Sequence, residues 1–198
     1  MVRGRKVILA SASPRRRELL ELIYPTFEIV PSDFDEDNVS TELPPAEYVV
    51  RAAAQKARAV AEGQKDAIVI GADTIVVVDG RILGKPTDVQ DARRMLRLLA
   101  GRTHQVYTGV CVISVQKGKP SEAEGVERTG VTVRALTDEL IERYIGTGEP
   151  MDKAGAYAIQ GKGAVLIQRV DGCYFNVVGL PVYLLSTLLE DLGMELFG

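Results

Sequence analysis

The sequence predicts an α/β protein, because segments with strand character alternate with segments of helical periodicity. Residues 7–10 and 67–78 consist mainly of Val, Ile, Leu and Ala, as is typical of buried strands. Residues 45–62 instead place apolar side chains at helical spacing. The run 67–78 is almost continuously apolar, which indicates a central strand covered on both faces.

Length and composition favour an ordinary globular protein. The chain has 198 residues, of which 46% are hydrophobic and 26% are charged. This size suits one domain or two small lobes that share a sheet, and we expect a single domain over residues 1–198. No apolar run approaches the length of a membrane span, and the first residues lead into a strand rather than a signal peptide. We therefore expect a cytoplasmic protein that does not contact a membrane.

Charge and cysteine content exclude two further classes. The formal net charge of -3 argues against a protein that binds nucleic acid independently of sequence, because such proteins present a dominant basic surface. The two cysteines, Cys111 and Cys173, lie in apolar surroundings without the spacing of a zinc site or a disulfide framework. We expect both to be core residues.

The first predicted helix, residues 14–23, carries an unusual basic start. Helix N-termini normally favour acidic residues, yet Arg15, Arg16 and Arg17 occupy the first turn here. Together with the hydroxyl of Ser11 and the free amides of the helix start, these arginines predict a cradle for an anion such as phosphate. The alternative is a solvated basic helix end, and we assign Arg17 to that alternative.

The next segments predict an acidic loop and a long helix. Residues 27–30 form a short strand, and the loop 31–37 that follows could hold a hard cation through its carboxylates, although this signal is weak alone. In the helix 45–62, Lys56 lies beside the edge of the apolar stripe. Its spacing alone predicts a surface lysine.

Asp73 is the one charged residue in the predicted strand 67–78. An unpaired carboxylate in such a strand costs several kcal/mol, so it requires a cation, a metal or a cleft. The alternative functions for Asp73 are a strand-end cap or a structural pair with an arginine. The Asp79-Gly80 turn predicts a hairpin that returns Lys85 to the level of Asp73, where its charge could stabilise the carboxylate and bind phosphate oxygens.

The second half of the chain contains one further unusual stretch. We expect helices at 88–100, after Thr137 and from Pro181, strands at 106–115 and up to 133, and a hairpin through Asp171-Gly172. Residues 149–164 combine glycines, acids and lysines, a composition typical of a functional loop. The single histidine, His104, lacks the companions of a nucleophilic hydrolase, and we assign it no catalytic role.

Several of these motifs together resemble one known family. They are Leu-Ala-Ser-Ala-Ser-Pro-Arg-Arg at 9–16, Gly-Ala-Asp-Thr at 71–74, Gly-Lys-Pro at 84–86, Glu-Pro-Met-Asp-Lys-Ala-Gly-Ala-Tyr at 149–157 and Val-Gly-Leu-Pro at 178–181. In this order, and over nearly the whole chain, they resemble the Maf family of nucleotide pyrophosphatases.

The resemblance implies a fold and a reaction. The fold would be a mixed sheet with flanking helices, arranged as two lobes around a cleft and related to the inosine-triphosphate pyrophosphatases, often as a homodimer. The reaction would hydrolyse a nucleoside triphosphate to the monophosphate and pyrophosphate.

The same resemblance assigns roles to residues. Asp73 would act as the base, while Lys56 and Lys85 would assist catalysis around the phosphates, and Ser11 and Arg16 would bind the phosphates. Glu36 and Asp73 would hold a divalent cation, Mg²⁺ or Mn²⁺, although Asp35 replaces the more usual glutamate beside Glu36.

Three positions resemble markers of a subfamily. Arg15, Thr74 and Gln160 match the branch that hydrolyses dTTP and UTP, and a glutamine can offer a paired donor and acceptor to a pyrimidine edge. Two alternatives remain open at this point. The protein could be a nucleotide-binding regulator of cell division or septum formation, or a pyrophosphatase for other nucleotides such as 7-methyl-GTP.

Overall fold

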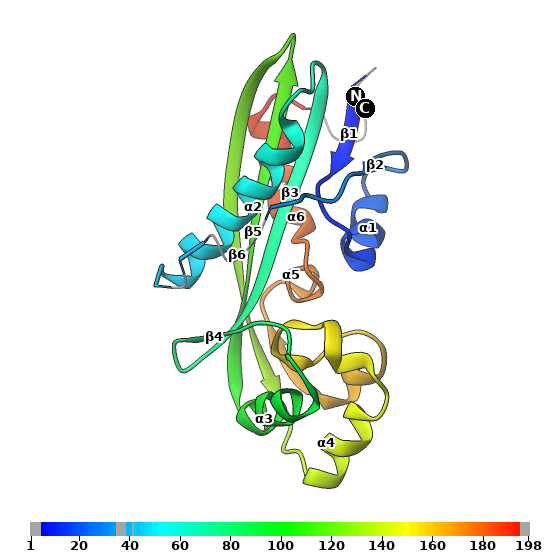
Figure 1. Ribbon diagram of the computed structural model, residues 1–198, viewed down its shortest axis with the longest axis vertical. Helices are drawn as coiled ribbons and strands as arrows, with labels where there is room; N and C mark the ends of the chain where they lie inside the picture. Colours follow the sequence, from blue (N-terminus) through cyan, green and yellow to red (C-terminus); the bar gives the residue numbers. More distant parts are fainter. Residues whose placement is uncertain (1–4, 35–38, 41, 195–198) are drawn as a thin grey trace. The chain divides into compact units, whose positions relative to one another are not determined.

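The computed structural model describes residues 5–34, 39–40 and 42–194. Figure 1 shows how helices accompany the strands of the sheet. The strands are β1 (Lys6–Leu9), β2 (Glu28–Ile29), β3 (Ala67–Val78), β4 (Arg81–Leu83), β5 (Thr103–Gln116), β6 (Lys119–Val133) and β7 (Ile167–Asp171). The α-helices are α1 (Pro14–Glu21), α2 (Pro45–Ala61), α3 (Val89–Leu99), α4 (Asp138–Ile145), α5 (Tyr174–Val178) and α6 (Val182–Asp191), and the 3₁₀ helices are η2 (Glu149–Asp152), η3 (Ala154–Ala156) and η4 (Gly161–Leu166).

The strands of the described residues form one seven-stranded sheet in the order β2-β1-β3-β5-β6-β7, with β4 paired to β3. β1 runs parallel to both β2 and β3, and its register places Leu9 opposite Ile70. β4 is antiparallel to β3, and β7 is antiparallel to β6. The prediction of an α/β protein with a mixed sheet and flanking helices is therefore confirmed.

The chain divides into two compact units. The first contains residues 1–73, 108–127 and 179–198, and the second contains residues 74–107 and 128–178. The divisions fall within β3, β5 and β6, so each of these long strands contributes to both units. Each unit also has a hydrophobic core of its own.

In the first unit, α2 packs on the sheet through small residues. The core there combines alanines of the helix with branched residues of β1, β3 and β5, among them Ala53, Ala57, Ile8, Val69 and Ile113. The predicted apolar stripe of this helix is confirmed, because its buried residues include Val49, Ala53, Ala57 and Val60.

In the second unit, α3 and α4 cover the far halves of the long strands. Its core includes Val76, Leu96, Leu99, Ile141 and Leu166. Both helices begin with a side-chain cap, since Asp88 accepts from the amide of Asp91 and Thr137 accepts from the amide of Leu140. These caps satisfy amides that the helices cannot pair internally, and they explain the starts of α3 and α4.

Three local predictions need correction. No returning strand follows Asp171-Gly172 in the described residues, because the chain enters α5 there after β7 has paired with β6. Residues 149–164 are largely organised as η2, η3 and the start of η4 rather than as an irregular loop. Cys111 is buried as expected, whereas Cys173 is only half-buried.

Among the described residues, no helix combines the length and apolar character required to cross a membrane.

The single histidine is a core residue of the second unit. His104 is 1% exposed, its Nε2 lies 2.7 Å from the hydroxyl oxygen of Tyr157, and the two rings meet edge to face. Its Nδ1 is buried without a hydrogen-bond partner among the described residues. Burial lowers the pKa of His104 to about 4, because a buried imidazole resists becoming charged.

This burial predicts a stability loss in mild acid. The unfolded chain binds a proton on His104 near pH 6.5 and the folded chain only near pH 4, so the unfolded state binds more protons between these values. The free energy of unfolding should therefore fall as pH falls from 6.5 to 4, by about 3 kcal/mol from this group. Urea unfolding of the wild type and of His104→Gln at several pH values would measure the difference.

Carboxylates also contribute to acid sensitivity, so the informative quantity is the difference between wild type and variant. Tyr157→Phe is the matched control, because it removes the hydroxyl partner and leaves the imidazole buried. Its free energy of unfolding should still fall in mild acid, as in the wild type. Parallel pH profiles for wild type and His104→Gln would contradict the expected contribution.

Candidate functional site

Ser11 and Arg16 are joined by a hydrogen bond at the end of β1. The Nη1 of Arg16 donates to Ser11 Oγ at 3.1 Å, and its Nε donates to the carbonyl oxygen of Gly179 at 2.9 Å. Ser11 is 8% exposed and also accepts from the amide of Ser13 at 3.3 Å. The structure thus brings these two predicted phosphate-binding residues into contact.

The arginines on either side of Arg16 have different environments. Arg17 is exposed and pairs with Glu21 one turn later at 2.8 Å, an ion pair of the kind that contributes little to stability. This pairing agrees with its assignment to the solvated helix end. Arg15 is half-buried in the first turn of α1. Ser13 is the N-cap of α1 but makes no side-chain cap bond.

Lys56 and Asp73 form a buried ion pair. Lys56 Nζ lies 2.6 Å from Asp73 Oδ1, and the two side chains are 11% and 7% exposed. The prediction of a surface lysine from spacing was therefore wrong. The spacing of apolar residues in α2 does not show how closely the helix packs on the sheet. This close packing buries residues at the edge of the apolar stripe as well as those at its centre.

Glycines explain why the lysine of α2 reaches the carboxylate of β3. A Cβ atom at Gly71 would lie 2.4 Å from the carbonyl oxygen of Ala53, and one at Gly109 would lie 2.2 Å from that of Val49. Only a residue without a side chain permits this approach of helix backbone to strands. Because Asp73 follows Gly71 by two residues, it shares the strand face on which α2 packs.

The pairing register places Ser11 near the same end of the strands. Leu9 lies opposite Ile70, and the amide of Ala10 donates to the carbonyl oxygen of Ile70 at 2.8 Å. Ser11 therefore leaves β1 at the level where β3 approaches Asp73. Among the described residues, the first unit thus contributes five of the predicted site residues, Ser11, Arg15, Arg16, Lys56 and Asp73.

Three predicted site residues, Thr74, Lys85 and Gln160, lie in the second unit. Lys85 is exposed just after β4, whose hairpin at Asp79-Gly80 is confirmed by the pairing of Val78 with Arg81. Thr74 and Gln160 are half-buried. The carbonyl oxygen of Gly84 accepts from the amide of Gly155 at 3.0 Å, which ties the chain beside Lys85 to the segment that leads to Gln160.

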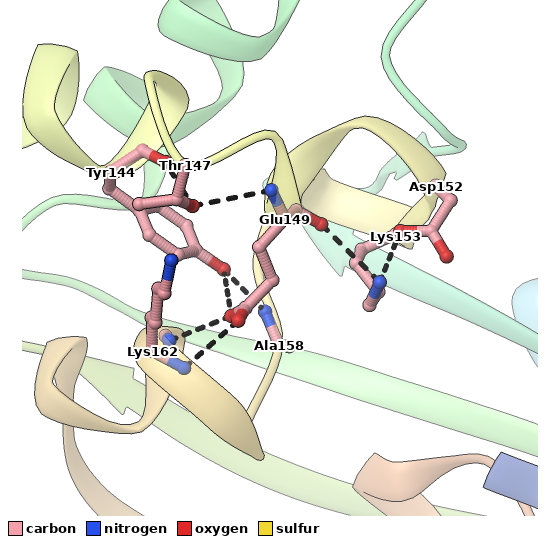
Figure 2. Close-up of polar contacts among 8 residues, drawn as sticks. Tyr144, Thr147, Glu149, Asp152, Lys153, Ala158 and Lys162 are labelled. Atoms are coloured by element: carbon pink, nitrogen blue, oxygen red, sulfur yellow. Dashed lines mark hydrogen bonds and ion pairs between the residues drawn. The ribbon is translucent and has the colours of Figure 1, made fainter.

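Glu149 is the centre of a polar cluster whose members lie before and after Gln160 in the chain. Figure 2 shows the contacts of this cluster. The carboxylate of Glu149 accepts from the amides of Lys162 at 2.9 Å and Gly163 at 2.8 Å, and from the hydroxyl of Tyr144 at 3.0 Å. The same hydroxyl oxygen accepts from the amide of Ala158 at 3.1 Å. Sequence reasoning marked this stretch as functional but gave no individual role to Glu149 or Tyr144.

The hydrogen bonds of this cluster favour the charged form of Glu149. Burial works to raise the pKa of its carboxyl, but the two amides and the Tyr144 hydroxyl, with nearby Lys153, outweigh burial and hold that pKa below its ordinary value. Burial also raises the pKa of the Tyr144 hydroxyl. Both groups are therefore well suited to a permanent role as hydrogen-bond partners.

Of the predicted metal ligands, the structure describes Asp73 but not Glu36. Glu36 and its neighbour Asp35 lie outside the described residues. Across residues 5–34, 39–40 and 42–194, no three His, Cys, Asp or Glu side chains gather as a metal-binding group. Asp73 alone offers the oxygen chemistry that a hard cation prefers, beside the charge of Lys56.

The fold and this site define an α/β protein that places a buried lysine-aspartate pair close in the fold to a serine-arginine contact. Residues 6–192 match the family model described as Maf-like protein, and the chain belongs to that family. The expectation from the sequence motifs is thereby confirmed.

Curated relatives match almost the entire chain. It is 54% identical to a dTTP/UTP pyrophosphatase of Moorella thermoacetica, with 98% of each chain covered. It is 48% identical to a dTTP/UTP pyrophosphatase of Dictyoglomus thermophilum, with 97% of this chain and 98% of that protein covered. Among solved structures, the Ham1 protein of Staphylococcus aureus is similar at 17% identity and a TM-score of 0.48, with 94% of this chain and 99% of that chain covered.

The close contact at Gly71 predicts that Gly71→Ala destabilises the protein. The added Cβ would overlap the Ala53 carbonyl oxygen and contact the Ala57 side chain, so backbone must move. Overpacking of this kind costs about 1 to 3 kcal/mol. Urea unfolding would measure the loss, with Gly84→Ala as the control because a Cβ there meets nothing within 4 Å. Equal urea midpoints for the two variants would contradict the close packing of α2 on β3.

Proposed function

We propose that the protein is a nucleoside triphosphate pyrophosphatase that hydrolyses dTTP and UTP to the monophosphate and pyrophosphate. The observation that carries this proposal is the buried pair of Lys56 and Asp73 near the Ser11–Arg16 contact. A carboxylate beside fixed cations suits the hydrolysis of a polyanion. Support for the substrate comes from relatives named dTTP/UTP pyrophosphatase that share about half of their residues over nearly full length.

In this proposal the cationic side chains bind the triphosphate. Arg16 and the Ser11 hydroxyl bind phosphate oxygens, with the guanidinium aligned by its bond to the Gly179 carbonyl oxygen. Lys56 and Lys85 stabilise the negative charge that develops on the phosphoryl oxygens during reaction. A fixed guanidinium and a buried ammonium need little reorganisation as that charge develops.

Asp73 provides the base in this proposal. It orients a water molecule and accepts its proton, while the water oxygen forms a bond to the α-phosphorus. The bond from the α-phosphorus to the bridging oxygen then breaks, and that oxygen leaves with pyrophosphate. The nearby Lys56 ammonium fixes the orientation of the carboxylate through the 2.6 Å contact.

A divalent cation fits the donor chemistry of this site. Asp73 and Glu36 are the proposed ligands, and Mg²⁺ or Mn²⁺ would supply neutralisation of triphosphate charge when bound. We further propose that the enzyme acts in the cytoplasm, as a homodimer and without nucleic acid or membrane partners.

Arg15, Thr74 and Gln160 are the proposed specificity residues. The amide group of Gln160 can donate to and accept from the polar edge of a pyrimidine through two separate atoms, whereas an ionised carboxylate can only accept. Arg15 lies one residue before the phosphate-binding Arg16, and Thr74 follows the proposed base directly. Base recognition and phosphate chemistry are thereby carried by adjacent residues in both motifs.

A substrate panel tests this function. We expect kcat/KM with Mg²⁺ to be highest for dTTP and UTP among dTTP, UTP, CTP, GTP and 7-methyl-GTP. Gln160→Ala should lower the values for dTTP and UTP by about tenfold or more, because lost hydrogen bonds leave polar groups of the base unpaired. The values for GTP should change much less.

Gln168→Ala on the exposed face of β7 is the matched control and should retain the wild-type preference. Three results would defeat the assignment: a wild type that prefers 7-methyl-GTP, a loss by Gln160→Ala that is equal for all five nucleotides, or nucleotide binding without hydrolysis. The last result would favour the regulator of cell division.

A further inference from the structure

Gln160 occupies a position in the fold that a capping residue normally takes. It is the N-cap of η4, where Ser, Thr, Asp or Asn usually accepts a hydrogen bond from the amides of the first turn. The side chain of Gln160 makes no such cap bond. The first turn of η4 therefore depends on another acceptor.

Glu149 supplies that acceptor from a distant position. Its carboxylate receives the amides of Lys162 and Gly163, which are the second and third residues of η4. A negative charge at this end of a helical turn is favourable, since the unpaired amides there carry partial positive charge. Glu149 thus caps η4 in place of Gln160.

Tyr144 holds the other side of the same segment. Its hydroxyl donates to Glu149 and accepts from the amide of Ala158, two residues before Gln160. The backbone is therefore anchored on both sides of Gln160, through Ala158 before it and through Lys162 and Gly163 after it (Figure 2).

The glycines of this segment are required by the same contacts. A Cβ at Gly161 would lie 2.6 Å from Glu149 Oε2, and one at Gly163 would lie 2.5 Å from the Tyr144 hydroxyl oxygen. Gly161 also has a φ of 67°, a backbone conformation that favours glycine. The two glycines of the sequence Gln-Gly-Lys-Gly thus allow this segment to pack closely against Glu149 and Tyr144.

We infer that Glu149 and Tyr144 are positioning residues for substrate selection, which hold the Gln160 backbone so that its side chain is available to read the nucleobase. This inference rests on the proposed function, because it requires a pyrimidine nucleotide as substrate. Neither residue touches the substrate in this account. Their effect is transmitted through the backbone of residues 158–163.

Glu149→Gln tests the inference with little change in shape. The new NH₂ group would face a donor, since every partner of the carboxylate shown in Figure 2 donates to it. We expect the ratio of kcat/KM for dTTP over GTP to fall by about tenfold, with most of the change in the dTTP value. Amide hydrogen exchange of residues 158–163 should become faster in the same variant.

Asp152→Asn is the matched control, because it makes the same acid-to-amide change in η2 on a carboxylate that is 70% exposed. It should leave the ratio and the exchange rates unchanged. In the Gln160→Ala background, Glu149→Gln should lower the ratio no further, since there is no glutamine left to position. A purely structural role would instead give an additional loss for every nucleotide.

Should Glu149→Gln fail to fold, Tyr144→Phe carries the test, with the same predicted fall in ratio and faster exchange. An unchanged ratio, or an equal loss for dTTP and GTP, would overturn the inference when the wild type prefers dTTP. A wild type without any preference for dTTP or UTP would instead refute the proposed function itself.

Discussion

The buried ion pair between Lys56 and Asp73 imposes the strongest constraint on the first unit. Taking both charges out of water costs free energy that can exceed their Coulomb attraction, and removing one partner of such a pair, here joined at 2.6 Å, costs about 3 to 5 kcal/mol. The fold nevertheless brings α2 onto β3 through Gly71 and Gly109, so that the lysine reaches the carboxylate. A costly arrangement that needs glycines to form is better explained by chemistry than by stability.

The second unit uses the half-buried charge of Glu149 in a different way. Glu149 accepts three hydrogen bonds and the Tyr144 hydroxyl accepts a fourth, so the amides of Ala158, Lys162 and Gly163 are paired within the unit. In the first unit the carboxylate of Asp73 is the proposed base, whereas the carboxylate of Glu149 binds backbone amides. The same residue chemistry thus serves catalysis in one proposal and substrate selection in the other.

The sequence was sufficient to predict most elements and to single out several candidate site residues, because strand runs, caps and turn residues act locally. Asp73 stood out because a carboxylate contradicts an apolar strand, and the arginines of α1 stood out because they contradict the helix dipole. Lys56 was misplaced, since helical spacing cannot show how closely Gly71 lets α2 approach. The role of Glu149 in capping η4 was also beyond reach, because the acceptor and the amides are separated by 13 and 14 residues and no local pattern links them.

The most direct test of this account is pyrophosphate release from dTTP by Asp73→Asn and by Lys56→Met/Asp73→Asn, with circular dichroism used to confirm folding at the assay temperature. The double variant removes both charges together, so it separates loss of chemistry from the cost of an unpaired buried ammonium. The account predicts that both folded variants release pyrophosphate at least about 10²-fold more slowly than the wild type, the scale of losing a positioned base. A folded variant of either kind that retains turnover close to the wild type would contradict it.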